Sequence, residues 1–188
     1  MASQSNEEAT IPTWFRIFFP RVLRQVAEEL GEVRTMLNQQ RRAANPKYRR
    51  GEMESPLDAL GILGELVARN YCVVMNIPYR AAPLVALNPV RRPDLIIGNF
   101  SIDVKTSRPD AADLLVNRDA HLDRDKQISH YWFVKPVETT LALASFVSVA
   151  EVDQWNVKDV RHKSSNPDAP ESLAHFVPWT DHFPAGSY

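Results

Sequence analysis

A short turn signal between two apolar runs constrains the fold of this chain most strongly. Gly98-Asn99 stands between residues 94–97 and 100–105, and both flanking runs are rich in residues that favour strands. Two-residue loops of this composition join antiparallel strands in a tight hairpin. The sequence therefore predicts a hairpin in which Asp94 faces Asp103 across the two strands.

The predicted hairpin gathers charged side chains at one edge of a small sheet. Side chains alternate along a strand, so Lys105 shares a face with Asp103. Two carboxylates directly opposite each other are destabilising, and a structural hairpin does not need them. A bound Mg²⁺ removes the conflict, because it favours one or two carboxylates together with waters and phosphate oxygens. The pattern predicts a metal site at which Lys105 holds or activates a water, or stabilises developing charge.

These residues match a known pattern. Pro93-Asp94, then eight residues, then Asp103-Val104-Lys105 resembles the PD-(D/E)XK nuclease superfamily, whose fold is restriction-endonuclease-like. Members commonly carry a glutamate on the helix before the first core strand, and Glu65 stands there. The resemblance covers roughly residues 55–150, about half the chain, with the same order of helix, strand, hairpin and strand.

The resemblance implies an α/β (α+β) fold with a four-stranded mixed sheet flanked by helices. It implies Mg²⁺-dependent cleavage of phosphodiester bonds in DNA, with Mn²⁺ as a substitute metal. Asp94 and Asp103 then bind the metal, Lys105 positions or activates water, and Glu65 supports the metal site. The carbonyl of Val104 is a further expected ligand. Sequence-specific members usually act as dimers, so we expect a homodimer.

Several functions stay open at this point. The first is an endonuclease, either a type II restriction-like enzyme or a phage or mobile-element nuclease. The alternatives are a catalytically inactive nuclease-fold subunit for DNA binding or assembly, and a structure-specific junction resolvase. RNA in place of DNA is a third alternative. The plainest interpretation is a surface hairpin whose charges are solvated.

The chain divides by pattern into an N-terminal helical arm, residues 1–50, and a nuclease-like domain, residues 51–188, with a Pro-rich C-terminal extension. Apolar residues at helical spacing predict a helix over residues 20–40, after an aromatic anchor at 14–19. Residues 41–55 read as a linker, and Ser55-Pro56 begins a second helix that runs to about residue 69. Further strands are expected at 71–77, 112–116, 131–134 and 141–149, and a capping box at 148–151 begins a short helix.

Charge is unevenly distributed along the chain. Residues 1–50 contain 9 Lys and Arg against 5 Asp and Glu, a net of +4, whereas residues 109–188 contain 7 against 12, a net of -5. A basic stripe in the arm favours contact with phosphates, although a solvated helix end is an equal alternative. The candidate DNA-binding residues are Arg34, Arg41, Arg42, Lys47, Arg49 and Arg50, with Thr106 and Ser107 near the scissile phosphate. Gln127 is a further candidate, since Gln127-x-x-x-Tyr131 resembles a motif of RecB-like members.

Other features set limits on function and location. The single cysteine, Cys72, excludes an internal disulfide and a four-thiolate zinc site, and six glycines include no phosphate-binding loop. The sequence contains no apolar run long enough to span a membrane and no secretory signal pattern at its start, so we expect a cytoplasmic protein without a membrane partner. Gly61 and Gly64 form a strip without side-chain bulk on the second helix, which predicts a close approach there.

Overall fold

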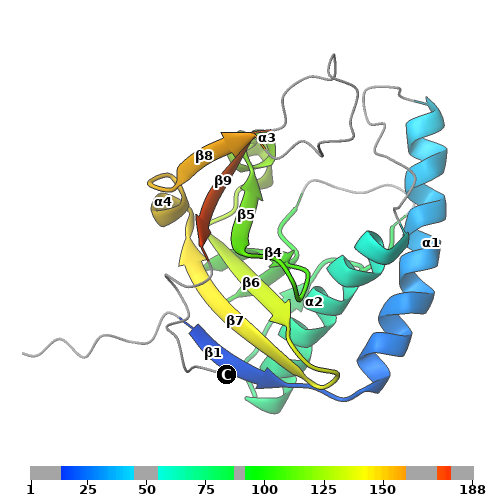
Figure 1. Ribbon diagram of the computed structural model, residues 1–188. Coiled ribbons are helices and arrows are strands. Elements are labelled where there is room, and N and C mark those ends of the chain that lie inside the picture. The colour runs from blue at the N-terminus through cyan, green and yellow to red at the C-terminus, as the bar shows by residue number, and fades with distance from the viewer. Residues whose placement is uncertain (1–13, 45–54, 87–91, 160–172, 179–188) are drawn as a thin grey trace, which may run out of the picture.

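The computed structural model describes residues 14–44, 55–86, 92–159 and 173–178. Within these residues the fold is mixed α/β, with two β-sheets and two long helices (Figure 1). The larger sheet has the strand order β1 (Trp14–Phe18), β7 (Leu141–Ser148), β6 (His130–Pro136), β4 (Phe100–Thr106), β3 (Leu95–Ile97), β2 (Arg80–Ala81). The smaller sheet has the order β5 (Asp113–Asn117), β9 (Leu173–Pro178), β8 (Asn156–Asp159). The helices are α1 (Val22–Ala44), α2 (Ser55–Val74), α3 (Arg118–Leu122) and α4 (Val149–Val152), with a 3₁₀ turn over Arg124–Lys126.

The larger sheet is mixed because β4 and β6 pair in parallel, whereas its other neighbouring strands pair antiparallel. The parallel pair requires a crossover, and residues 107–129 supply it with β5, α3 and the 3₁₀ turn. The resemblance implied four strands, and the described sheet has six, since β1 and β2 extend its two edges.

The predicted hairpin is confirmed in its register. Leu95 pairs with Ile102, and Ile97 pairs with Phe100, so Gly98-Asn99 forms the two-residue loop. Gly98 has a φ of 54°, a value that glycine adopts without steric cost and that two-residue hairpin loops need.

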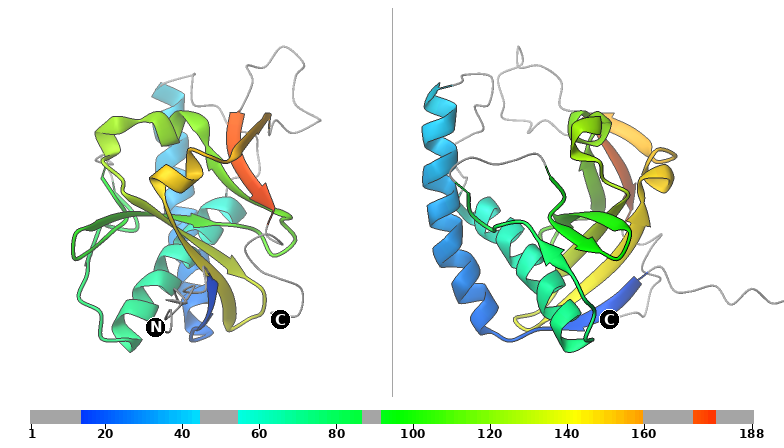
Figure 2. Two further views of the ribbon diagram at one scale, coloured as in Figure 1. Left: turned by 90° about the vertical axis from the view of Figure 1, so that its left-hand side faces the viewer. Right: turned by 180° about the vertical axis from the view of Figure 1, so that it is seen from behind.

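Each face of the larger sheet covers its own hydrophobic core. Along β6, Trp132 and Val134 lie in a core shared with α2, whereas Tyr131 and Phe133 lie in a second core shared with β5. This alternation is the two-residue period of a strand buried on both faces. The smaller sheet thus covers the opposite face from α2, as the views in Figure 2 also show.

α2 lies directly on the larger sheet, against β4 and β6, and α1 packs on α2 (Figures 1 and 2). Two glycines permit these contacts. A Cβ on Gly31 would come within 2.7 Å of the Ala59 backbone, and a Cβ on Gly64 would come within 1.8 Å of Thr106 Oγ1. The close approach predicted from the glycine strip is confirmed at Gly64.

Two local predictions are wrong. Residues 71–74 belong to α2 and not to a strand: Cys72 is fully buried while Val73 and Val74 are exposed, because only one face of a helix meets the core. The linker expected from residue 41 begins later, since α1 continues through Ala44. The predicted aromatic anchor at 14–19 is confirmed: residues 14–18 form the edge strand β1, paired with β7, and Ile17 and Phe19 are buried in the core shared with α2.

The described part of the chain contains no helix long and apolar enough to cross a membrane. The expected domain boundary at residue 50 lies outside the described residues.

Candidate active site

The centre of the site is the buried carboxylate of Asp103 on β4, which is 2% exposed. Two ammonium groups contact it. Lys105 lies two residues further on the same strand face, and its Nζ is 2.5 Å from Oδ2 of Asp103. Lys126, at the end of the 3₁₀ turn, forms an ion pair with Oδ1 of Asp103. Both oxygens of one buried carboxylate are therefore held by positive charge.

The electrostatics of Asp103 follow from these two contacts. Burial alone raises the pKa of a carboxyl group, because it disfavours the charged form. Here the two lysines, Lys105 before Lys126, outweigh burial and lower the pKa of Asp103 to about 2. Asp103 is thus ionised throughout the physiological range although it has almost no contact with solvent.

Asp94 lies directly before β3, and its Oδ2 accepts a hydrogen bond of 2.8 Å from the backbone N–H of Val104. This bond ties the first acid to the strand segment between Asp103 and Lys105. Burial, followed by repulsion from Asp103 and Glu65, raises the pKa of Asp94 to about 7. Three acidic side chains therefore interact electrostatically at one end of the hairpin: Asp94 and Asp103, as the turn predicted, and Glu65, as the family resemblance implied.

Glu65, on α2, is held between two arginines. Arg34 of α1 donates to Oε1 of Glu65 over 2.8 Å, and Arg69 lies 3.3 Å from Oε2. Both arginines also donate to backbone carbonyls of the segment between α2 and β3, Arg34 to Leu84 and Arg69 to Ala82. This network fixes Glu65 and the connecting segment relative to α1.

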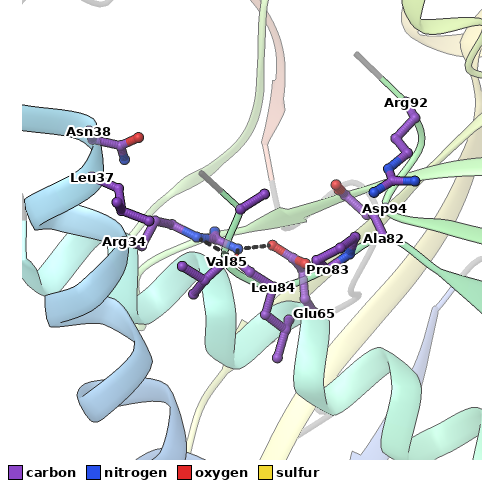
Figure 3. A pocket seen from close by; sticks show the side chains of 11 residues that line it. Arg34, Leu37, Asn38, Glu65, Ala82, Pro83, Leu84, Val85, Arg92 and Asp94 are labelled. Carbon is purple, nitrogen blue, oxygen red and sulfur yellow. Dashed lines mark hydrogen bonds and ion pairs between the residues drawn. The ribbon is translucent and has the colours of Figure 1, made fainter. Parts of the chain in front are cut away.

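A cavity of about 250 Å³ opens beside these acids (Figure 3). Glu65 and Asp94 line it together with Arg34 and Arg92, and Pro83, Leu84 and Val85 supply part of an apolar wall. Figure 3 shows Arg92 beside Asp94 on one side of the cavity and the Arg34–Glu65 ion pair on the other. A polar ligand that enters the cavity reaches Asp94 and Glu65 directly.

The chain was compared with protein families, curated proteins and solved structures, and none of them matches it.

The donor set suits a hard divalent cation. Among the described residues, no three Asp, Glu, His or Cys side chains lie close enough together to hold a metal ion by themselves. Mg²⁺ does not require such a group, because it keeps several waters and binds through one or two carboxylates plus substrate phosphate. Burial, and then repulsion from Asp103 and Glu65, raises the pKa of Asp94, and a divalent cation beside it would favour its charged form. Asp94 and Asp103 fit the role of ligands, with Glu65 and the carbonyl of Val104 beside them.

The predicted DNA-binding residues, and the further candidate Gln127, lie in different surroundings. Arg34 is engaged with Glu65 and Leu84, so its guanidinium forms part of the site's scaffold. Thr106 Oγ1 is buried beneath Gly64, whereas the backbone N–H of Ser107 donates to Val134 just beyond the strand. Gln127 is exposed and has a φ of 48°. The predictions for Lys47, Arg49 and Arg50 lie outside the described residues, as do the side chains of Arg41 and Arg42.

Two site residues were not predicted from the sequence. Lys126 reaches Asp103 only because the crossover returns beside β4 before β6 begins, and no local pattern reports that. The sequence motif singled out Gln127, which is the residue next to Lys126. That motif was the available signal, although it marked the neighbour of the side chain that contacts Asp103. Arg92 precedes the Pro93-Asp94 motif and lines the cavity.

Proposed function

We propose that this protein is a Mg²⁺-dependent nuclease of the restriction-endonuclease-like type, which hydrolyses phosphodiester bonds in DNA. One observation carries the proposal: the buried carboxylate of Asp103 is contacted by Lys105 and Lys126, and Asp94 is bonded to the same strand segment. A carboxylate pair can hold a divalent cation, and an adjacent ammonium can stabilise the charge that develops on phosphate oxygens. A solvated surface hairpin does not bury these groups.

The metal supplies two things when bound, a Lewis acid for the phosphate oxygens and a water of lowered pKa. Asp94 and Asp103 would hold it, with the carbonyl of Val104 and Glu65 in support. The chain's own lysines perform the remaining work. Lys105 is 28% exposed and its ammonium can orient a water or neutralise charge on the pentacovalent phosphorus. Lys126 adds a second positive charge on the other oxygen of Asp103.

The overall reaction requires no further reactant. A water oxygen forms a new bond to phosphorus while one phosphorus–oxygen ester bond breaks. The departing oxygen takes up a proton, and the products are a phosphate monoester and a free hydroxyl. The positive groups around Asp103 oppose the charge that accumulates on the phosphate oxygens as the bond breaks.

DNA and a dimer belong to the proposal as its finer parts. Arg92 at the cavity offers positive charge next to the acids, and the basic end of the first helix, with Arg41 and Arg42, is the sequence feature that favours phosphate contact. Cleavage of both strands requires two active sites, which favours a homodimer. α1 presents Val22 and Met36, each 55% exposed, as apolar surface for the second copy.

The testing experiment incubates the full chain with supercoiled plasmid in Mg²⁺, in Mn²⁺ and in EDTA. We expect nicked and linear products with either metal and none in EDTA. Asp103→Asn and Lys105→Met should each lower the rate by at least about 10²-fold. Asp110→Asn is the matched control, since it makes the same replacement at an exposed acid outside the site and should cleave like the wild type.

The same assay separates the alternatives. Cleavage in EDTA, or full activity in both site variants, contradicts the metal mechanism. Binding of DNA without cleavage of plasmid, branched or single-stranded substrates identifies an inactive binding subunit. Preference for four-way junctions over plasmid identifies a resolvase, and one discrete set of linear fragments identifies a restriction-like enzyme.

A further inference from the structure

A chain of hydrogen bonds joins α3 and the end of α4 to β6, the strand beside the site. His121, on α3, lies with its Nδ1 2.9 Å from the hydroxyl of Tyr131 and its Nε2 2.8 Å from Oδ1 of Asp153. The His121 side chain is 1% exposed, whereas Asp153 is 54% exposed. The three residues come from α3, β6 and the end of α4, so the chain of bonds connects elements that are far apart in sequence.

The carboxylate of Asp153 can only accept, so Nε2 of His121 carries a proton in this contact. In the neutral imidazole, Nδ1 then accepts from the hydroxyl of Tyr131. The pKa of Tyr131 is raised by burial and then by Asp103 and Asp153, which keeps its hydroxyl protonated as a donor. Asp153 thereby fixes both the tautomer and the ring orientation of His121.

The two residues joined by the first hydrogen bond, His121 and Tyr131, are each linked to one of the two lysines of the site. The ring of Tyr131 lies 5.9 Å from Nζ of Lys105, within the range of a cation–π contact, and Tyr131 pairs with Asp103 across β4 and β6. His121 anchors α3, and the segment that follows carries Lys126 onto Asp103. His121 is the residue that anchors α3: its side chain is 1% exposed and forms both hydrogen bonds, whereas Leu122 is 58% exposed.

The segment from α3 to Lys126 borders a cavity, so the hydrogen bonds of His121 help to hold it in place. A cavity of about 270 Å³ lies beside it, lined by His121, Gln127, Tyr131 and Asp153 among others. Dense packing therefore does not hold the segment on that side. The hydrogen bonds of His121, together with the ion pair of Lys126 to Asp103, tie the segment to the larger sheet.

From this geometry we propose that Asp153, His121 and Tyr131 form a positioning network that holds Lys105 and Lys126 over Asp103. The proposal rests on the nuclease function for its kinetic consequence. The claim that the network positions Lys105 and Lys126 does not depend on the nuclease function. A displacement of about 1 Å in a reacting group can cost on the order of 10²-fold in rate, so a small shift of the lysines is measurable.

The test compares three variants of the full chain. Asp153→Ala removes the acceptor of His121, Asp153→Asn retains an oxygen acceptor there, and Tyr131→Phe retains the ring but loses the hydroxyl. Asp153 is half exposed, so its variants should fold. Glu151→Ala is the matched control, because it removes an exposed acid from neighbouring α4. We expect Asp153→Ala and Tyr131→Phe to lower kcat about 10-fold with KM and Mg²⁺ affinity unchanged, Asp153→Asn to restore most of kcat, and Glu151→Ala to match the wild type.

A second measurement does not depend on cleavage. The side-chain NMR resonances of Lys105 in the metal-free protein report its place over the Tyr131 ring, and hydrogen exchange reports the order of residues 118–128. We expect Asp153→Ala to shift those resonances and speed exchange, and Asp153→Asn and Glu151→Ala to leave both near wild type. Unchanged resonances and exchange in Asp153→Ala overturn the network. If Asp153→Ala shifts the resonances but the wild-type protein cleaves no nucleic acid, the network stands and the nuclease function is rejected. Loss of kcat in step with the melting temperature reduces the network to a structural role and contradicts the proposal.

Discussion

The backbone N–H of Val104 donates a 2.8 Å hydrogen bond to Oδ2 of Asp94. This single contact links the two motifs of the site, because Val104 stands between Asp103 and Lys105. It places Asp94 beside a second buried acid, and burial with that repulsion raises the pKa of Asp94 to about 7. The charged form of Asp94 is therefore disfavoured in the folded protein.

Asp94→Asn should stabilise the metal-free protein at alkaline pH. The pKa of Asp94 in the folded state lies above the ordinary value of 3.8, so the folded state binds the proton more tightly. This tighter proton binding stabilises the folded wild-type protein fully below about pH 4, and the stabilisation is lost as the pH rises through about 7. At pH 8 the variant should exceed the wild type by on the order of 4 kcal/mol, since one pKa unit is about 1.4 kcal/mol.

Urea unfolding in EDTA at pH 4 and pH 8 measures this difference. The variant and the wild type should agree at pH 4, where Asp94 is protonated in the folded protein. A variant less stable than the wild type at pH 8 contradicts the electrostatic account.

Lys126→Met should bind Mg²⁺ more tightly than the wild type while it cleaves more slowly. The wild-type ammonium competes with a cation for Asp103, whose charge it neutralises. Its removal leaves Lys105 as the remaining lysine on that carboxylate, and the gain in metal affinity should be about 10-fold. Calorimetric titration with Mg²⁺ measures the affinity, and weaker binding in the variant would mean that Lys126 supports the metal ligands.

Gly64→Ala should destabilise the protein by about 1–3 kcal/mol, because its Cβ would meet Thr106 Oγ1 at 1.8 Å and force α2 away from β4. Gly61→Ala on the same helix is the control. Its Cβ would have only the Arg34 guanidinium nearby, at 3.5 Å, so it should be neutral or stabilising by up to about 1 kcal/mol. Denaturation of the two variants compares these sites, and equal effects refute the close-packing explanation.

Arg34 and Arg92 should differ in their effect on DNA binding. Arg34 is committed to Glu65 and the carbonyl of Leu84, so Arg34→Met should lower the free energy of unfolding by about 2 kcal/mol and leave the salt dependence of binding unchanged. Arg92→Met should leave stability unchanged and reduce the salt slope by about one. Binding measured in several salt concentrations decides this, and the reverse result would return Arg34 to the phosphate contacts.

The sequence was most informative where the chemistry is local. The Gly98-Asn99 turn defines the register of its hairpin, and that register puts Asp103 and Lys105 on one face, as found. The cap at Ser148 is also local, and its side chain accepts from the N–H of Glu151 as the capping box predicts. Such features depend on a few neighbouring residues and a known turn or cap geometry.

The remaining features depend on tertiary contacts. Lys126 meets Asp103 through a parallel crossover, and β8 and β9 of the smaller sheet pair across residues 160–172. Arg34 reads as part of a basic stripe until α1 packs on α2 and brings it to Glu65. Residues 71–74 form a short apolar run, and periodicity alone does not separate a strand from the end of a helix.

Parallel titrations with Mn²⁺, one of binding and one of plasmid nicking, test the central claim most directly. Suppose that Asp94 and Asp103 hold the catalytic metal. The Mn²⁺ concentration at which half of the protein has bound metal, with plasmid present, should then equal the concentration that gives half of the maximal nicking rate. Asp103→Asn then loses both signals, and Asp110→Asn loses neither. Nicking that proceeds without bound metal, or metal binding that survives in Asp103→Asn, contradicts the account.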